Sequence, residues 1–64
     1  RDMLRRAEAA LARLKPLTRE IFLLHRFDGL EYSEIAAAKG ISVKGVEKHI
    51  AKALVVVRRA RSGR

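Results

Sequence analysis

The 64-residue chain contains no cysteine, no tryptophan and only one proline. Without cysteine, neither a disulfide framework nor a thiolate metal site can form. The histidines His25 and His49 have no ligand-spaced neighbours, so we expect no metal ion and no cofactor. No hydrophobic run is long enough to cross a bilayer, and no signal peptide is visible. These absences favour the reduced cytoplasm without direct membrane insertion. Since residue 1 is Arg rather than Met, a fragment of a longer protein remains an open interpretation.

Catalytic patterns are also missing. Thr18, Ser33 and Ser42 have no His and Asp partners at suggestive spacing, and no glycine-rich loop could cradle a phosphate. We therefore predict that the protein is not an enzyme and has no small-molecule substrate. One tyrosine and two phenylalanines are too few to form a platform that stacks single-stranded bases. The length allows one small domain, close to the lower limit for independent folding.

The charge is strongly positive and unevenly distributed. Fifteen basic residues against seven acidic ones give a formal net charge of +8. Residues 1–32 hold seven basic and five acidic side chains, a net +2, whereas residues 33–64 hold eight and two, a net +6. This excess is the pattern expected of a phosphate-binding surface. The alternative is a solvated basic face that only keeps the domain soluble.

Apolar residues at helical spacing predict a compact all-α domain of four helices over residues 1–61, with a frayed tail over 62–64. The first helix is expected over 2–14, before Pro16, and the second from Pro16 to the turn signal at Asp28-Gly29. The third is expected over 31–39 and the fourth from 43 to about 61. The predicted core comprises Leu11, Leu14, Ile21, Leu24, Tyr32, Ile35, Ala36, Ile41, Val46, Ile50 and Leu54, with Phe22 and Phe27 in or near it.

Residues 32–50 predict a helix-turn-helix. Ile35 and Ala36 give the first helix a small apolar face, and Gly40 can adopt a positive φ that ends it. Ser42 can then cap the second helix. The expected inward face of that second helix consists of Val43, Val46, Ile50, Leu54 and Val57, with Ile50 and Leu54 at the centre of the domain. A helix-turn-helix places its second helix in the DNA major groove.

The opposite face of the fourth helix carries the candidate DNA contacts. Lys44 and Lys48 lie near its start, where side chains usually meet base edges. Glu47 could accept a hydrogen bond from cytosine or pair with a neighbouring lysine. His49 lies on the other flank, and we expect a surface or packing role for it. The predicted DNA-binding residues are Arg19, Ser33, Lys44, Gly45, Glu47, Lys48, Lys52, Arg58 and Arg59, of which Lys52, Arg58 and Arg59 fit phosphate contacts.

Val55 and Val56 fall on the side of the lysines rather than of the core. One explanation is that the first helix folds back and covers one of them. The other is an exposed apolar patch that binds a protein partner. The sequence leaves both explanations open.

Residues 14–59 resemble region 4 of the sigma-70 family, in its extracytoplasmic-function group. The resemblance is carried by the residue runs Arg19-Glu20-Ile21-Phe22-Leu23-Leu24, Gly29-Leu30, Tyr32-Ser33-Glu34-Ile35-Ala36, Gly40-Ile41-Ser42, and Ile50-Ala51-Lys52-Ala53-Leu54, together with Leu14, Val46 and Arg58. The run Val46-Glu47-Lys48-His49-Ile50 is most similar to the iron-starvation subgroup.

This resemblance implies a bacterial transcription initiation factor. Region 4 of such a factor binds the −35 promoter element and docks on RNA polymerase through the flap of the β subunit. An anti-sigma regulator often covers the domain. The chain departs from the family pattern at Glu31, at Gly45, and at Lys15-Pro16-Leu17. Glutamate is a poorer helix N-cap than serine or threonine, and Gly45 removes a contact side chain from the second helix.

Two other functions compete with this interpretation. The effector domain of LuxR-type response regulators shares Glu34-Ile35-Ala36 and Val46-Glu47-Lys48-His49, although Tyr32 stands where that family usually has a small polar residue. A purely protein-binding module, with an incidental basic face, is the second alternative. Salt dependence separates the latter from DNA binding, which weakens steeply as salt rises.

Overall fold

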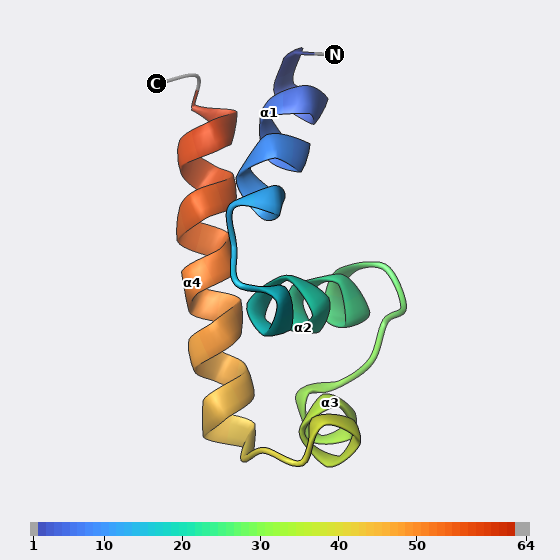
Figure 1. The fold of residues 1–64 in the computed structure, drawn as a ribbon. Helices are drawn as coiled ribbons and strands as arrows, with labels where there is room; N and C mark the ends of the chain where they lie inside the picture. The colour runs from blue at the N-terminus through green and yellow to red at the C-terminus, as the bar shows by residue number, and fades with distance from the viewer. Residues whose placement is uncertain (1, 63–64) are drawn as a thin grey trace.

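The computed structural model describes the backbone of residues 2–62 and the side chains of residues 5–62, and the regular secondary structure in this part of the chain is all helix (Figure 1). Its four helices are α1 (Asp2–Ala12), α2 (Pro16–Arg26), α3 (Tyr32–Lys39) and α4 (Val43–Arg61). The predicted all-α class is confirmed. Of the tail expected over 62–64, residues 63 and 64 lie outside the described residues. Ser62 follows α4, and its backbone N–H donates to the carbonyl of Arg58 at 3.0 Å.

The helices begin and end where proline and glycine predict. Pro16 is the first residue of α2, a position where the missing N–H would be unpaired in any helix. Gly29 and Gly40 both have positive φ, at 71° and 66°. Gly40 ends α3 in the left-handed conformation, and the next amide, that of Ile41, donates to the carbonyl of Ala36 at 3.0 Å. Helix α1 ends two residues earlier than predicted.

Helix α4 is the axis of the fold and packs against all three other helices (Figure 1). Helix α1 lies along the C-terminal part of α4, α2 crosses its middle, and α3 lies beside its N-terminus. The start of α1 and the end of α4 lie at the same end of the molecule. The molecule measures 35 × 18 × 16 Å, so it is elongated along α4. The helix-turn-helix of α3 and α4 therefore forms one end, and the α1–α4 pair forms the other.

The core is centred where α2, α3 and α4 meet. Ile21, Ile35 and Val46, one from each helix, are fully buried. The rest of the buried cluster consists of Phe22, Ala36, Ile50 and Ala53, and several predicted core residues pack against it half-buried: Leu11, Leu14, Leu24, Tyr32, Ile41 and Leu54. Each of the three crossing helices thus contributes buried apolar residues to one shared cluster.

Three predicted packing positions were wrong. Leu54 is half-buried rather than central, because the inward face of α4 is centred on Val46, Ile50 and Ala53, one residue earlier in the helix. Val43 is 41% exposed for the same reason. Phe27 is 73% exposed, since it follows the last residue of α2 and its ring does not reach the core.

Candidate nucleic-acid interface

Side-chain hydrogen bonds cap the N-terminal ends of both helices of the helix-turn-helix. Ser42 caps α4, since its Oγ accepts from the backbone N–H of Gly45 at 3.0 Å. At the start of α3, the backbone N–H of Glu31 donates to Oε1 of Glu34 at 2.8 Å. Glu34 therefore supplies the reciprocal half of a capping box. The weak N-cap expected from Glu31 is thereby strengthened by its neighbour.

An ion pair fastens α3 to α2. Nζ of Lys39 lies 2.7 Å from Oε1 of Glu20, with the two side chains 22% and 56% exposed. Such a partly exposed pair contributes less than about 1 kcal/mol. It nevertheless fixes the position of Lys39, the basic residue in the last turn of α3. Together with the capped turn, the pair limits how α3 can move relative to α4.

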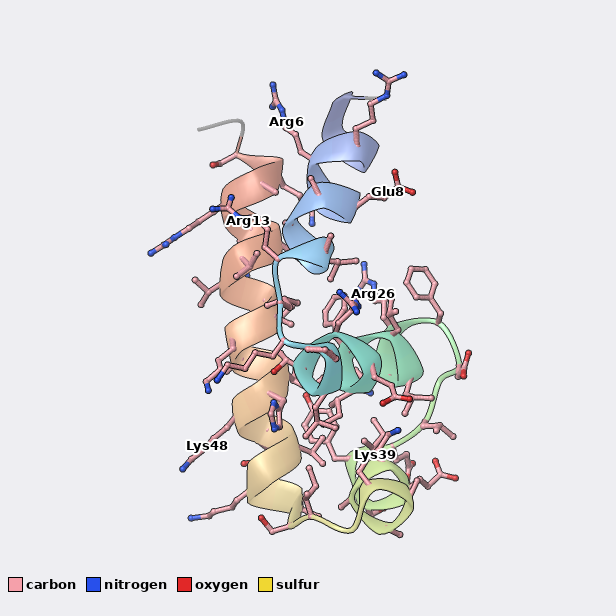
Figure 2. All side chains as sticks on the ribbon, viewed as in Figure 1. Arg6, Glu8, Arg13, Arg26, Lys39 and Lys48 are labelled. Carbon is pink, nitrogen blue, oxygen red and sulfur yellow. The ribbon has the colours of Figure 1, made fainter. Side chains whose placement is uncertain are left out.

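One face of α4 presents a lysine on each of three successive turns. Lys44, Lys48 and Lys52 are all exposed. Figure 2 shows Lys48 projecting from the side of α4 that faces away from α2 and α3. We call these three residues the lysine face. Glu47 is also exposed, and within the described residues no ion pair joins its carboxylate to a lysine. The carboxylate of Glu47 therefore has no recorded salt-bridge partner in this part of the chain.

Gly45 lies beside this face and is half-buried against the turn. A Cβ added to it would sit 3.3 Å from Oγ of Ser42 and 3.7 Å from Cδ1 of Ile41. The first of these distances is tighter than an ordinary van der Waals contact. Gly45 therefore leaves room for the serine cap, besides removing a side chain from the surface.

The remaining predicted DNA contacts are dispersed. Arg19 is half-buried, and its Nη1 donates to the carbonyl of Ala12 at 3.5 Å, so it braces the end of α1. Ser33 is exposed in the first turn of α3. Arg58 and Arg59 are exposed in the last turns of α4, far along the helix from the turn. The structure thus brings Lys44, Gly45, Glu47, Lys48 and Lys52 together and places the other four at a distance along the fold.

Sequence reasoning missed one polar contact at this interface. Thr18, in α2, is buried, and its Oγ1 lies 2.8 Å from Nδ1 of His49 in α4. The two residues are 31 positions apart, so no local sequence signal could have paired them. His25 has a different role, because its Nδ1 donates to the carbonyl of Leu30 at 2.9 Å and its ring packs against Tyr32.

At the other end of the molecule, α1 and α4 form an open cleft of about 680 Å³. Val56 lies in it, whereas Val55 is 47% exposed on α4. Its lining combines alanines and Val56 with three exposed arginines: Arg6, Ala9, Ala10, Arg13, Val56, Arg59 and Ala60. We call this the arginine cleft. Val56 is half-buried, so helix α1 covers it only in part.

The described residues offer neither a membrane-spanning helix nor a cluster of metal ligands. No helix among them is both long enough and apolar enough to span a lipid bilayer. Nor do these residues contain a group of three or more His, Cys, Asp or Glu side chains that could hold a metal ion.

Comparisons with known proteins agree with the resemblance noted from the sequence. A family model described as sigma-70, region 4 matches residues 4–55. The chain is 45% identical over 53 residues to the ferric citrate uptake sigma factor FecI of Escherichia coli (strain K12). That alignment covers 83% of this chain and 31% of the relative, so the chain spans about a third of the relative's length. No solved structure matches it.

Proposed function

The chain belongs to the sigma-70 region 4 family, a non-enzymatic family, and on that premise we propose that it binds the −35 element of promoter DNA. It would do so as part of a bacterial RNA polymerase sigma factor that directs transcription initiation. The observation that carries this proposal is the lysine face, three exposed lysines on successive turns of a helix whose start is fixed by Gly40 and Ser42.

In this mechanism the N-terminal turns of α4 enter the major groove. Lys44 and Lys48 donate to base edges, where guanine O6 and N7 are the preferred lysine acceptors. Glu47, whose carboxylate has no recorded lysine partner, accepts from a cytosine amino group. Lys52 contacts a phosphate farther along the helix. Ser33, Arg19, Arg58 and Arg59 remain proposed phosphate contacts around this centre.

The proposal includes two protein partners. We infer that RNA polymerase, through the flap of its β subunit, or an anti-sigma regulator docks on Val55 and Val56. Val56 lies in the arginine cleft and Val55 is exposed beside it, which supports a docking role for this end of α4. The name of the ferric citrate uptake relative further supports a role in iron acquisition for the factor that contains this domain.

DNA binding is tested by fluorescence anisotropy with a 20-bp duplex that the chain selects from a randomised pool. Affinity should fall with salt by about 0.9 log units per phosphate contact for each log unit of salt. Lys44→Ala and Lys48→Ala should each weaken binding, while the free energy of unfolding changes by less than about 0.5 kcal/mol.

Arg26→Ala is the matched control, because Arg26 is exposed on α2, away from the side of α4 that carries Lys48 (Figure 2). It removes one positive charge from another surface, so it should bind almost as tightly as the parent. Equal losses for Arg26→Ala and Lys48→Ala would mean that only net charge matters, and the groove-facing assignment would be wrong.

Partner binding is tested with Val55→Ser and Val56→Ser. Each variant is titrated with RNA polymerase core enzyme and, separately, with the selected duplex. We expect loss of polymerase binding while DNA affinity is retained. If polymerase binding is unchanged in both variants, RNA polymerase docks elsewhere on the domain.

A further inference from the structure

The contact between Thr18 and His49 joins α2 to α4, the helix that carries the lysine face. Thr18 is only 3% exposed, and it is the one buried polar side chain among the described residues. Its Oγ1 lies 2.8 Å from Nδ1 of His49, which is a short hydrogen bond for an O–H···N pair. Since Thr18 belongs to α2 and His49 to α4, the bond fixes the imidazole relative to the rest of the domain.

The position of the protons in the Thr18–His49 pair determines whether the other ring nitrogen, Nε2, is a hydrogen-bond donor. A neutral imidazole carries one proton, on Nδ1 or on Nε2. Among the described side chains, the buried Thr18 hydroxyl has no hydrogen-bond partner besides Nδ1. If Nδ1 donated, the hydroxyl proton would have no acceptor, so we assign the hydroxyl as the donor and Nδ1 as the acceptor. The proton of the neutral ring then sits on Nε2. A charged ring also carries a proton on Nε2, so Nε2 is a donor in either state.

His49 is placed where such a donor would meet the DNA backbone. It is half-buried, so its ring is anchored on one side and reaches solvent on the other. On α4 it follows Lys48 directly and precedes Lys52 by one helical turn, at the edge of the lysine face. In the described part of the chain, no hydrogen bond to Nε2 is recorded. Nε2 is thus a fixed donor on the stretch of α4 between Lys48 and Lys52.

We propose that His49 donates from Nε2 to a DNA phosphate, and that Thr18 is a positioning residue that holds the imidazole for this contact. The inference rests on the proposed function, because it requires the lysine face to bind duplex DNA. Side-chain donors to phosphate set the register and orientation of a protein on the duplex. A donor whose rotamer is already fixed loses less conformational entropy on binding than a free lysine does.

The amide side chains offer matched variants for this test. In His49→Asn the amide oxygen can occupy roughly the place of Nδ1 and accept from the Thr18 hydroxyl, but the outward donor is lost. In His49→Gln the amide nitrogen lies roughly at the place of Nε2, so a donor remains at the surface. Thr18→Val removes the hydroxyl at nearly constant volume, and Thr18→Ser retains it. All four variants are first compared with the parent by circular dichroism and thermal unfolding.

Binding to the selected 20-bp duplex is then measured by anisotropy. His49→Asn should weaken binding by about tenfold or more, the loss expected of one hydrogen bond to a charged group. His49→Gln and Thr18→Ser should retain most of the affinity, and Thr18→Val should lose part of it. Because Thr18 acts through His49, the double variant Thr18→Val/His49→Asn should bind no more weakly than His49→Asn alone.

Two results would overturn the inference. One is a His49→Asn variant that binds within twofold of the parent while Lys48→Ala binds more weakly, which leaves the proposed function intact. The other is a further loss from Thr18→Val in the His49→Asn background, which would mean that Thr18 supports the fold rather than the imidazole. If the parent chain selects no duplex, both this inference and the proposed function fail.

Discussion

The two halves of α4 differ in what they pack against. In the N-terminal half, residues 43–53, Val46, Ile50 and Ala53 are buried by α2 and α3. In the C-terminal half, residues 54–61, every residue is half-buried or exposed, and the neighbour is α1 across an open cleft. One continuous helix thus has a rigidly held end that carries the lysine face and a loosely covered end that carries the arginine cleft.

This difference teaches how a domain near the minimum size divides its few large apolar side chains. The largest fully buried side chains, Ile21, Ile35 and Val46, all lie where α2, α3 and α4 cross. The cleft between α1 and α4 is lined by alanines and Val56 rather than by large buried side chains, and alanines bury little area per residue. Local stability should therefore be highest around the helix-turn-helix and lowest around α1.

The difference between the two halves of α4 is tested most directly by removing the same two methyl groups from a valine in each half. Val46→Ala should cost about 2–3 kcal/mol, from two carbons at about 0.8 kcal/mol each plus the cavity left behind. Val56→Ala should cost about 1 kcal/mol or less, because Val56 is only half-buried. Urea unfolding followed by circular dichroism measures both. Equal costs would contradict the assignment of the core to the N-terminal half.

The loss from Val46→Ala is large relative to the whole domain. At about 0.05–0.15 kcal/mol per residue, a chain of this length has a total stability of about 3–10 kcal/mol. The variant should therefore melt well below the parent and could be partly unfolded at 37 °C. Val56→Ala should melt close to the parent.

The turn at Gly40 is the next most sensitive point of the N-terminal half. Gly40 has φ 66°, and a Cβ there would meet nothing within 4 Å. The cost of Gly40→Ala is therefore purely conformational, about 1–2 kcal/mol. Gly40→Asn should recover part of that loss, since asparagine tolerates the left-handed region. Thermal unfolding of both variants provides the measurement, and an Ala variant as stable as the parent would contradict the strained turn.

The two serines at the ends of α4 offer a smaller and matched test. Ser42→Ala removes the acceptor for the Gly45 amide and should cost about 1 kcal/mol. Ser62→Ala removes only a hydroxyl that donates to the carbonyl of Arg59, an exposed contact, and should cost less than about 0.5 kcal/mol. Urea titrations resolve this difference. A larger loss at Ser62 would show that the C-terminal half is the better anchored end.

The smallest expected effect concerns the ion pair between α2 and α3. Glu20→Gln leaves Lys39 without its partner, and it should cost less than about 0.5 kcal/mol because the carboxylate side is 56% exposed. That cost should vanish in 1 M NaCl, where screening is strong. Melting curves at low and high salt provide the measurement. A cost that persists at high salt would indicate a packing role for Glu20 instead.

Much of the fold could be predicted from the residues that begin, end or cap helices. Pro16, Gly40 and Ser42 have backbone or capping properties that act locally, so they set the helix ends regardless of the tertiary structure. The core was predicted less well, because a helical wheel ranks residues by hydrophobic bulk. It therefore favoured Leu54 over Ala53, although close packing of α4 against its neighbours buries the smaller residue completely.

The sequence predicted the lysines of the candidate site, but not the hydrogen bond that holds His49 beside them. The lysine face follows from a four-residue spacing, which any α-helix brings to one side. The contact between Thr18 and His49 depends on how α2 crosses α4, which no local pattern encodes. The prediction for Phe27 was wrong for a different reason, because its position after the last turn of α2 leaves its ring outside the core.

The packing of α1 on the far half of α4 has a consequence for the order of folding. It joins the two ends of the chain, so nearly all the residues lie in the loop that this contact closes. Loop-closure entropy rises with loop length, and the C-terminal half of α4 has no fully buried side chain to offset it. We expect α2, α3 and α4 to assemble first and α1 to dock last. Backbone amides of α1 should consequently exchange with deuterium fastest among the four helices.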